Sequence, residues 1–309
     1  MKKLRIIAII FLLSIWSMAG CSNKENVSDN IQTQEQESNK ITDMAGNEIN
    51  LKKTPEKMVV LLPSDVEILY ELGADKSIIG VGEYCNYPKE ALNKKIIATG
   101  DDLNVEQIIS LNPDVVVIGE MAQSTDQMKQ LKDAGILVAV TNSQNIADTY
   151  KAIKLLGQIS GKEKEADDLI ANMKDSFQEL EKKSKGNFEK TIYFEVSPLE
   201  FGLWTAGKDT FMQELADMLK VKNIFEDLPG WAEISEEQVL ERNPDFIVTT
   251  TMSNKDSSPV DEILARNNWE NIEAISKKQV FKGDSDMMTR PGPRLVDAAK
   301  ELYKFIYGE

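Results

Sequence analysis

The stretch VEQIISLNPDVVV, residues 105–117, returns later in the chain as EEQVLERNPDFIV, residues 236–248. Each copy has Glu-Gln near its start, then Asn-Pro-Asp, then an apolar run. A proline disfavours helical backbone in the residue before it, so each Asn-Pro ends a short helix. The apolar run that follows is typical of a buried strand. The repeat predicts two similar βα units, with Glu106 and Glu237 at matching exposed positions near the helix starts.

Strands and helices alternate on both sides of each copy, which is typical of parallel sheets. Residues 41–51 alternate around Ala-Gly-Asn and predict a small hairpin. Residues 146–186 contain no proline and have helical spacing of apolar residues, with Gly157 and Gly161 as candidate interruptions. We therefore predict an α/β fold with an N-terminal lobe over 41–145, a linking helical segment over 146–186 and a C-terminal lobe over 187–309.

The N-terminus, MKKLRIIAIIFLLSIWSMAGCSNKE, has a basic start, a short apolar run and small residues before Cys21. This pattern predicts a lipoprotein signal peptide over residues 1–20, with cleavage before Cys21 and a lipid such as palmitate on its thiol. Ordinary cleavage that leaves Cys21 free is the alternative. Residues 21–40 are polar and predict a disordered tether. The expected location is the outer face of the cytoplasmic membrane.

The composition excludes several classes of protein. The formal charge is −15 over 309 residues, which disfavours nucleic acid and anionic lipid as partners. The chain has no histidine, so sites built on histidine, including zinc capture and Ser-His-Asp catalysis, are excluded. With neither a nucleophile elbow nor a phosphate loop, we expect no enzyme and no resident metal. Once Cys21 is lipidated, Cys85 has no disulfide partner.

Several further stretches, in order along the chain, carry a resemblance: TDMAGNEINL, LLPSDVEILYELG, IIGVGEYCNYPKEA, LWTAGKDTFMQELADMLKVKNIF and RPGPRLVDAAKELYKFIYG. With the repeated stretch, they make residues 41–307 similar to the substrate-binding lipoproteins of ABC importers, within the iron-siderophore and vitamin B12 family. The resemblance implies two Rossmann-like lobes joined by one long rigid helix, with a ligand cleft between the lobes. The family domain would span about 57–309. It also implies a monomer that serves an ABC permease dimer and its ATPase, and a small hinge motion.

In that family a surface glutamate on each lobe docks onto arginine pockets of the permease. The matching positions here are Glu106 and Glu237, so a two-fold permease would meet the same acid twice. The alternative is that both are first-turn acids favoured by the helix dipole.

Ligands of open α/β sheets lie at the carboxyl ends of the strands, which directs attention to the loops there. Trp204 and Trp231 lie in Gly/Pro-flanked segments that we interpret as loops, whereas Cys85 is interpreted as a small buried hydrophobe. Tyr87 precedes a proline, so it has packing of the turn as an alternative role. The resemblance itself assigns ligand contact to Tyr84, Trp231 and Arg290. The candidate ligand-binding residues are Ser64, Tyr84, Tyr87, Trp204, Trp231 and Arg290.

Aromatic walls with little basic charge suit a large, nearly neutral ligand. Only Lys208 and Arg290 are basic near the expected cleft, too few for a triply anionic catecholate complex. The order of candidate ligands is therefore cobalamin or another corrinoid, then a ferric siderophore, then haem with Tyr84 or a methionine as axial ligand. One departure counts against the corrinoid, because Gly100 and Asp101 stand where such binders can carry a tryptophan.

Overall fold

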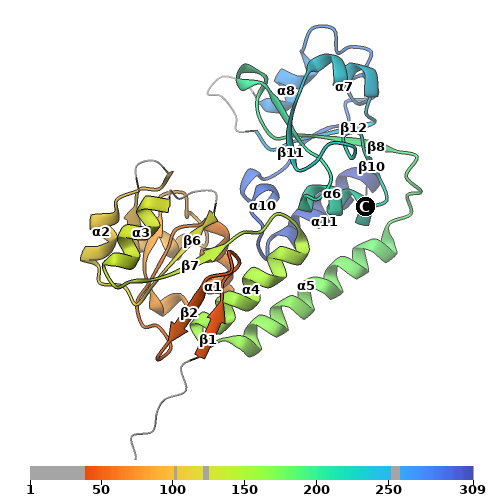
Figure 1. Cartoon of the computed structure of the whole chain (residues 1–309). Helices are drawn as coiled ribbons and strands as arrows, with labels where there is room; N and C mark the ends of the chain where they lie inside the picture. The colour runs from red at the N-terminus through yellow and green to blue at the C-terminus, as the bar shows by residue number, and fades with distance from the viewer. Residues whose placement is uncertain (1–38, 101–102, 121–124, 252–257, 309) are drawn as a thin grey trace, which may run out of the picture. The chain divides into compact units, whose positions relative to one another are not determined.

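The computed structural model describes residues 39–100, 103–120, 125–251 and 258–308 (Figure 1). All of these described residues belong to one compact unit. The predicted signal peptide, the lipidation site Cys21 and nearly all of the predicted tether lie outside the described residues, as does Asp101.

A small hairpin begins the described chain, as the alternation predicted. Strand β1 (Asn39–Thr42) pairs antiparallel with β2 (Glu48–Leu51). The Asp43 carboxylate closes the turn by accepting hydrogen bonds from the backbone amides of Ala45 and Asn47 at 3.0 and 2.7 Å. Its second oxygen accepts from the Val140 amide at 3.0 Å, which fixes the hairpin to the neighbouring sheet.

The first large sheet has five parallel strands in the order β5-β4-β3-β6-β7. Nearly every residue of its three central strands is buried, as expected for a sheet covered on both faces. Three α-helices lie among the described residues of this region, and the alternation of strands and helices predicted around the first copy of the repeat is confirmed. The strands are β3 (Met58–Val60), β4 (Ile78–Gly82), β5 (Lys95–Ile97), β6 (Val115–Gly119) and β7 (Leu137–Thr141), and the helices are α1 (Pro63–Glu71), α2 (Val105–Ser110) and α3 (Thr125–Asp133).

The linking segment consists of two helices, α4 (Ile146–Ser160) and α5 (Glu163–Lys183), of which α5 is the long one in Figure 1. The chain turns between them at Gly161, whose φ of 68° is the left-handed conformation that glycine adopts at low cost. Gly157 allows the two helices to pack closely, since a Cβ there would lie 2.6 Å from the Cβ of Ala166. Of the two candidate interruptions, Gly161 ends a helix and Gly157 lies inside one.

The second large sheet has four parallel strands in the order β10-β8-β12-β13, and a separate antiparallel ribbon joins β9 to β11. The sequence did not predict this ribbon. The strands are β8 (Thr191–Glu195), β9 (Leu203–Ala206), β10 (Lys222–Asn223), β11 (Trp231–Ile234), β12 (Phe246–Thr249) and β13 (Val280–Lys282), and the helices are α6 (Phe211–Met218), α7 (Glu236–Arg242), α8 (Pro259–Leu264), α9 (Glu273–Ser276), α10 (Ser285–Thr289) and α11 (Leu295–Tyr307).

The repeated Asn-Pro-Asp has the same structural role in both regions. Asn112 and Asn243 end α2 and α7 with positive φ angles of 48° and 43°. The Asp114 carboxylate accepts from the Lys57 amide at 2.9 Å, just before β3, and Asp245 accepts from the Thr191 amide at 2.9 Å, at the start of β8. Each aspartate therefore joins the strand after it to the start of the adjacent parallel strand, which accounts for this half of the repeat.

Candidate ligand pocket and docking helices

A cavity of about 230 Å³ lies at the carboxyl edge of the first sheet. Its walls are the segments that follow β3, β6 and β7, where the strand topology is expected to gather ligand-binding groups. The turn before α11 supplies the remaining wall. The lining residues are Leu62, Pro63, Ser64, Asp65, Gly119, Glu120, Thr141, Asn142, Ser143, Gln144, Thr289, Arg290 and Pro291.

Asp65 is the buried acid of this cavity. The residue is 2% exposed, and the Thr141 hydroxyl donates to its Oδ2 at 2.7 Å. Burial raises the pKa of the Asp65 carboxyl to about 7, and the hydrogen bond from Thr141 opposes this shift. Within the described ranges, no Lys or Arg forms an ion pair with Asp65.

Arg290 reaches the same cavity, but its guanidinium group is already engaged. Nη1 donates to Glu67 Oε1 at 3.0 Å and to Asn86 Oδ1 at 2.8 Å, and Nη2 donates to the Tyr84 carbonyl at 3.1 Å. Nη2 also lies 2.7 Å from Asp286 Oδ1. The charge of Arg290 is therefore balanced inside the chain by two carboxylates.

The Glu67 carboxylate is the centre of this network. It is 2% exposed and also receives Arg294, whose Nε lies 2.8 Å from Oε2 and whose Nη2 lies 2.6 Å from Oε1. The Arg294 guanidinium stacks over the Tyr87 ring at 4.1 Å from its centroid. Two arginines from the C-terminal part of the chain thus hold α1 and the loop that carries Tyr84 and Tyr87.

The candidate ligand residues fall into two groups. Ser64 and Arg290 line the cavity, and Tyr84 and Tyr87 lie in the loop that Arg290 and Arg294 hold. Tyr84 is 68% exposed and Tyr87 41% exposed, so both rings have free surface. The turn-packing alternative for Tyr87 also has support, because one face of its ring is covered by Arg294.

Trp204 and Trp231 form the second group, and our interpretation of their segments as loops is wrong. Both lie on the β9–β11 ribbon, where Trp204 is opposite Glu233 and Trp231 is opposite Ala206. Side chains alternate along a strand, so this register places both indoles on one face of the ribbon. Trp204 remains 39% exposed, whereas Trp231 packs edge-to-face on Phe211 at 5.4 Å.

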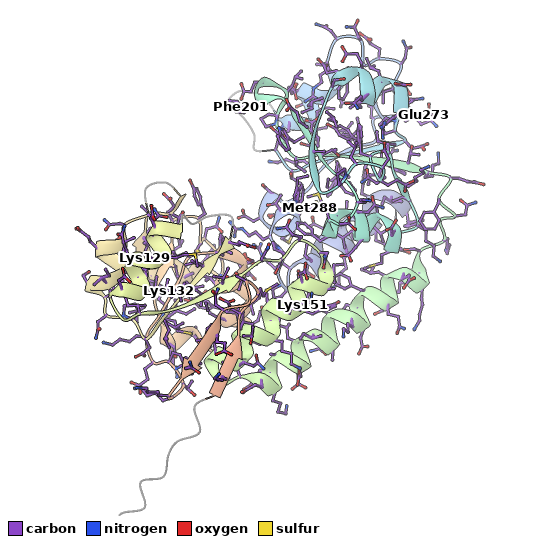
Figure 2. The ribbon with its side chains drawn as sticks, in the orientation of Figure 1. Lys129, Lys132, Lys151, Phe201, Glu273 and Met288 are labelled. Atoms are coloured by element: carbon purple, nitrogen blue, oxygen red, sulfur yellow. The ribbon has the colours of Figure 1, made fainter. Side chains whose placement is uncertain are left out.

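Three sulfur-containing side chains serve packing. Cys85 is buried, and burial raises the pKa of its thiol to about 12, so the interpretation as a small buried hydrophobe is confirmed. Met288 is 2% exposed and Met287 packs against the core. Figure 2 marks Met288 together with Phe201, which is 75% exposed.

Glu106 and Glu237 occupy the second position of α2 and α7, and both are exposed as predicted. The Asn104 side chain caps α2 by accepting from the Gln107 amide at 2.9 Å. Ser235 caps α7 within a capping box. Its hydroxyl also lowers the pKa of the Glu237 carboxyl, which is ionised at neutral pH.

A groove of about 600 Å³ lies beside Glu237, between α7 and α8. The Trp269 indole at its edge donates to Glu236 Oε2 at 2.9 Å, which fixes the first turn of α7 to the core. Arg266 lines the same groove, but it is buried and pairs with Glu195 at 2.6 Å. The hydrogen bond from Trp269 to Glu236 therefore holds the first turn of the helix that presents Glu237.

The described residues include neither a membrane-spanning helix nor a cluster of metal ligands. No helix there combines the length and the apolar character that crossing a membrane requires. In the same ranges, no three Cys, Asp or Glu side chains are grouped so that they could hold a metal ion.

Sequence reasoning missed Asp65 and Glu67 as residues of this site. A signal was present, because both acids stand in the otherwise largely apolar helix sequence PSDVEILYE. A carboxylate is seldom fully buried without a partner, so an acid among core positions indicates a paired or functional group.

The chain was compared with known protein families and structures. Residues 58–287 match the model of a family described as periplasmic binding protein. The chain is 38% identical to the uncharacterized ABC transporter substrate-binding lipoprotein YvrC of Bacillus subtilis, over 99% of this chain and 98% of that protein. It is 28% identical to a vitamin B12-binding protein of Salmonella paratyphi A, over 80% of this chain and 88% of that protein.

Among solved structures, a possible iron-binding, periplasmic solute-binding protein of Staphylococcus epidermidis superposes with a TM-score of 0.73 at 32% identity. The match covers 82% of this chain and all of that one. The two-lobe α/β architecture expected from the sequence agrees with this structure. Proteins of this kind are transport components that act outside the cytoplasm. The chain belongs to the periplasmic binding protein family, as the substrate-binding component of an ABC transporter.

Proposed function

We propose that this chain captures cobalamin or another corrinoid and delivers it to a membrane permease powered by an ATPase. The observation that carries the proposal is that the rings of Tyr84, Tyr87 and Trp204 are exposed, while Arg290 and Arg294, beside the two tyrosines, are paired with carboxylates inside the chain. Flat apolar faces with few cations suit a large ligand of low net charge. Similarity to vitamin B12-binding proteins supports the same choice.

A ferric siderophore is the second candidate ligand. The solved structure at 32% identity is described as a possible iron-binding protein. A neutral or cationic hydroxamate complex agrees with the acidic Asp65 cavity, whereas a triply anionic catecholate complex lacks cations here, since Glu67 and Asp286 balance Arg290. Haem is a weaker third candidate, because its carboxylates would meet the same acids.

The proposal extends to docking and anchoring. Glu106 and Glu237 would contact matching basic pockets of a permease dimer, since they occupy equivalent positions on two capped helices. Lipidated Cys21 would hold the monomeric protein on the outer face of the cytoplasmic membrane.

Thermal unfolding tests the choice of ligand. A ligand that binds only the native state raises the melting temperature with its concentration. The full chain in mild detergent is heated with cyanocobalamin, a neutral ferric hydroxamate or haem. The proposal expects the largest shift with cyanocobalamin. A shift with the ferric chelate alone would select the second candidate, and no shift with any of the three would contradict both.

A further inference from the structure

We propose that the cavity at the carboxyl edge of the first sheet binds a nitrogen-bearing arm of the ligand, an ammonium or a carboxamide, through N–H donors. This inference rests on the proposed function, because it specifies which chemical feature of a corrinoid or siderophore the chain recognises. The size of the cavity, about 230 Å³, suits one arm and is below the range of pockets that enclose whole ligands.

The first reason is the state of Asp65. Its Oδ2 receives the Thr141 hydroxyl at 2.7 Å, and it has no cation partner among the described residues. A buried carboxylate without a cation is unfavourable, so a donor group brought by a ligand would supply a missing interaction.

The second reason is a chain of hydrogen bonds among other residues that line the cavity. The Gln144 amide nitrogen donates to Asn142 Oδ1 at 2.9 Å, and the Asn142 amide nitrogen donates to Glu120 Oε2. Each amide thus gives an N–H to a neighbour within the wall, and the chain ends on a carboxylate. Glu120 is exposed at the cavity, so this wall also favours ligand groups that donate.

The third reason is the balance of charge. Arg290, the basic residue in the lining, is 12% exposed and already pairs with Glu67 and Asp286. Asp65 and Glu120 therefore leave the cavity acidic. A carboxylate arm would be repelled, an amide arm accepted, and an ammonium arm attracted.

Two sources can supply this chemistry, the peripheral carboxamides of a corrinoid and the amine of a ferric hydroxamate. Matched ligand pairs test the arm separately from the choice of ligand. The full chain in detergent is titrated by calorimetry with cyanocobalamin and with its monoacid derivatives, in which one carboxamide is a carboxylate. It is then titrated with an amine-bearing ferric hydroxamate and with the same complex carrying a methyl group in place of the amine, which removes the N–H donors.

For whichever pair binds, we expect one monoacid, or the methyl-terminated hydroxamate, to bind at least about tenfold more weakly than its partner. Asp65→Asn and, separately, Glu120→Gln should reduce that ratio, whereas Glu71→Gln at the other end of α1 should leave it unchanged. Glu120 is exposed, so its variant is informative even if Asp65→Asn folds poorly. Equal affinities within a pair that binds would overturn the inference alone. Absence of binding by every one of these ligands would overturn the proposed function and this inference with it.

Discussion

Glu106 and Glu237 carry the docking proposal at the scale of single residues. Both are exposed at the second position of a capped helix, so each carboxylate is presented to solvent from a defined place on the fold. Replacing either by alanine should weaken permease binding by about 2 kcal/mol or more, because a basic group of the permease would be left without its carboxylate partner. Pull-down of the permease from detergent extracts measures the loss.

A matched control is Glu241→Ala, an exposed acid in the last turn of α7. It should bind the permease normally, and all three variants should bind ligand like the unchanged chain. If Glu106→Ala or Glu237→Ala lowers ligand affinity instead, the docking role is wrong.

Asp65 predicts a pH dependence of stability. Its folded pKa of about 7 exceeds the ordinary value of 3.8, so the folded state binds the proton more tightly than the unfolded state. The free energy of unfolding should therefore decrease as pH rises from about 4 to about 7, by up to about 4 kcal/mol from this group. The Asp65→Asn substitution removes this pH-dependent contribution to the free energy of unfolding.

Urea unfolding at pH 4.5 and pH 7.5 checks this prediction. The Asn variant should resemble the unchanged chain at the lower pH and be more stable at the higher one. A constant difference between the two proteins across this window would mean that Asp65 does not titrate there.

At the scale of elements, the packing of α4 on α5 depends on Gly157. A methyl group there would meet the Ala166 Cβ at 2.6 Å, so Gly157→Ala should destabilise the fold by about 1–3 kcal/mol despite its better helix propensity. Adding Ala166→Gly should restore part of the loss in a urea titration. Additive effects of the two changes would show that the helices do not meet at these residues.

Periodicity and proline placement predicted the parallel strands, most helices and the exposure of Glu106 and Glu237, because these depend on local patterns. The β9–β11 ribbon was missed, since its pairing joins residues 203–206 to 231–234 across α6. The engagement of Arg290 was missed for the same reason. Its partner Glu67 lies 223 residues earlier, and no local pattern encodes such a contact.

At the scale of the whole molecule, several links join the C-terminal part of the chain to the first sheet and its helices. Helix α5 is one of these links. Two hydrogen bonds add to it, since the Phe211 amide donates to the Gln144 carbonyl at 3.1 Å and the Ile146 amide donates to Glu214 at 2.6 Å. Arg290 and Arg294, from the C-terminal part of the chain, form two more links because both pair with Glu67 on α1. These links predict that ligand binding changes the radius of gyration little. Small-angle scattering with and without ligand measures it, and a large compaction would contradict the prediction.

Calorimetric titration of the full chain with cyanocobalamin tests the central claim, corrinoid capture, most directly. The account predicts saturable binding with one ligand per chain, reduced when Tyr84 or Trp204 is replaced by alanine and unchanged in Glu106→Ala. Absence of heat with cyanocobalamin, together with saturable binding of a ferric hydroxamate, would contradict the claim and make this chain an iron carrier.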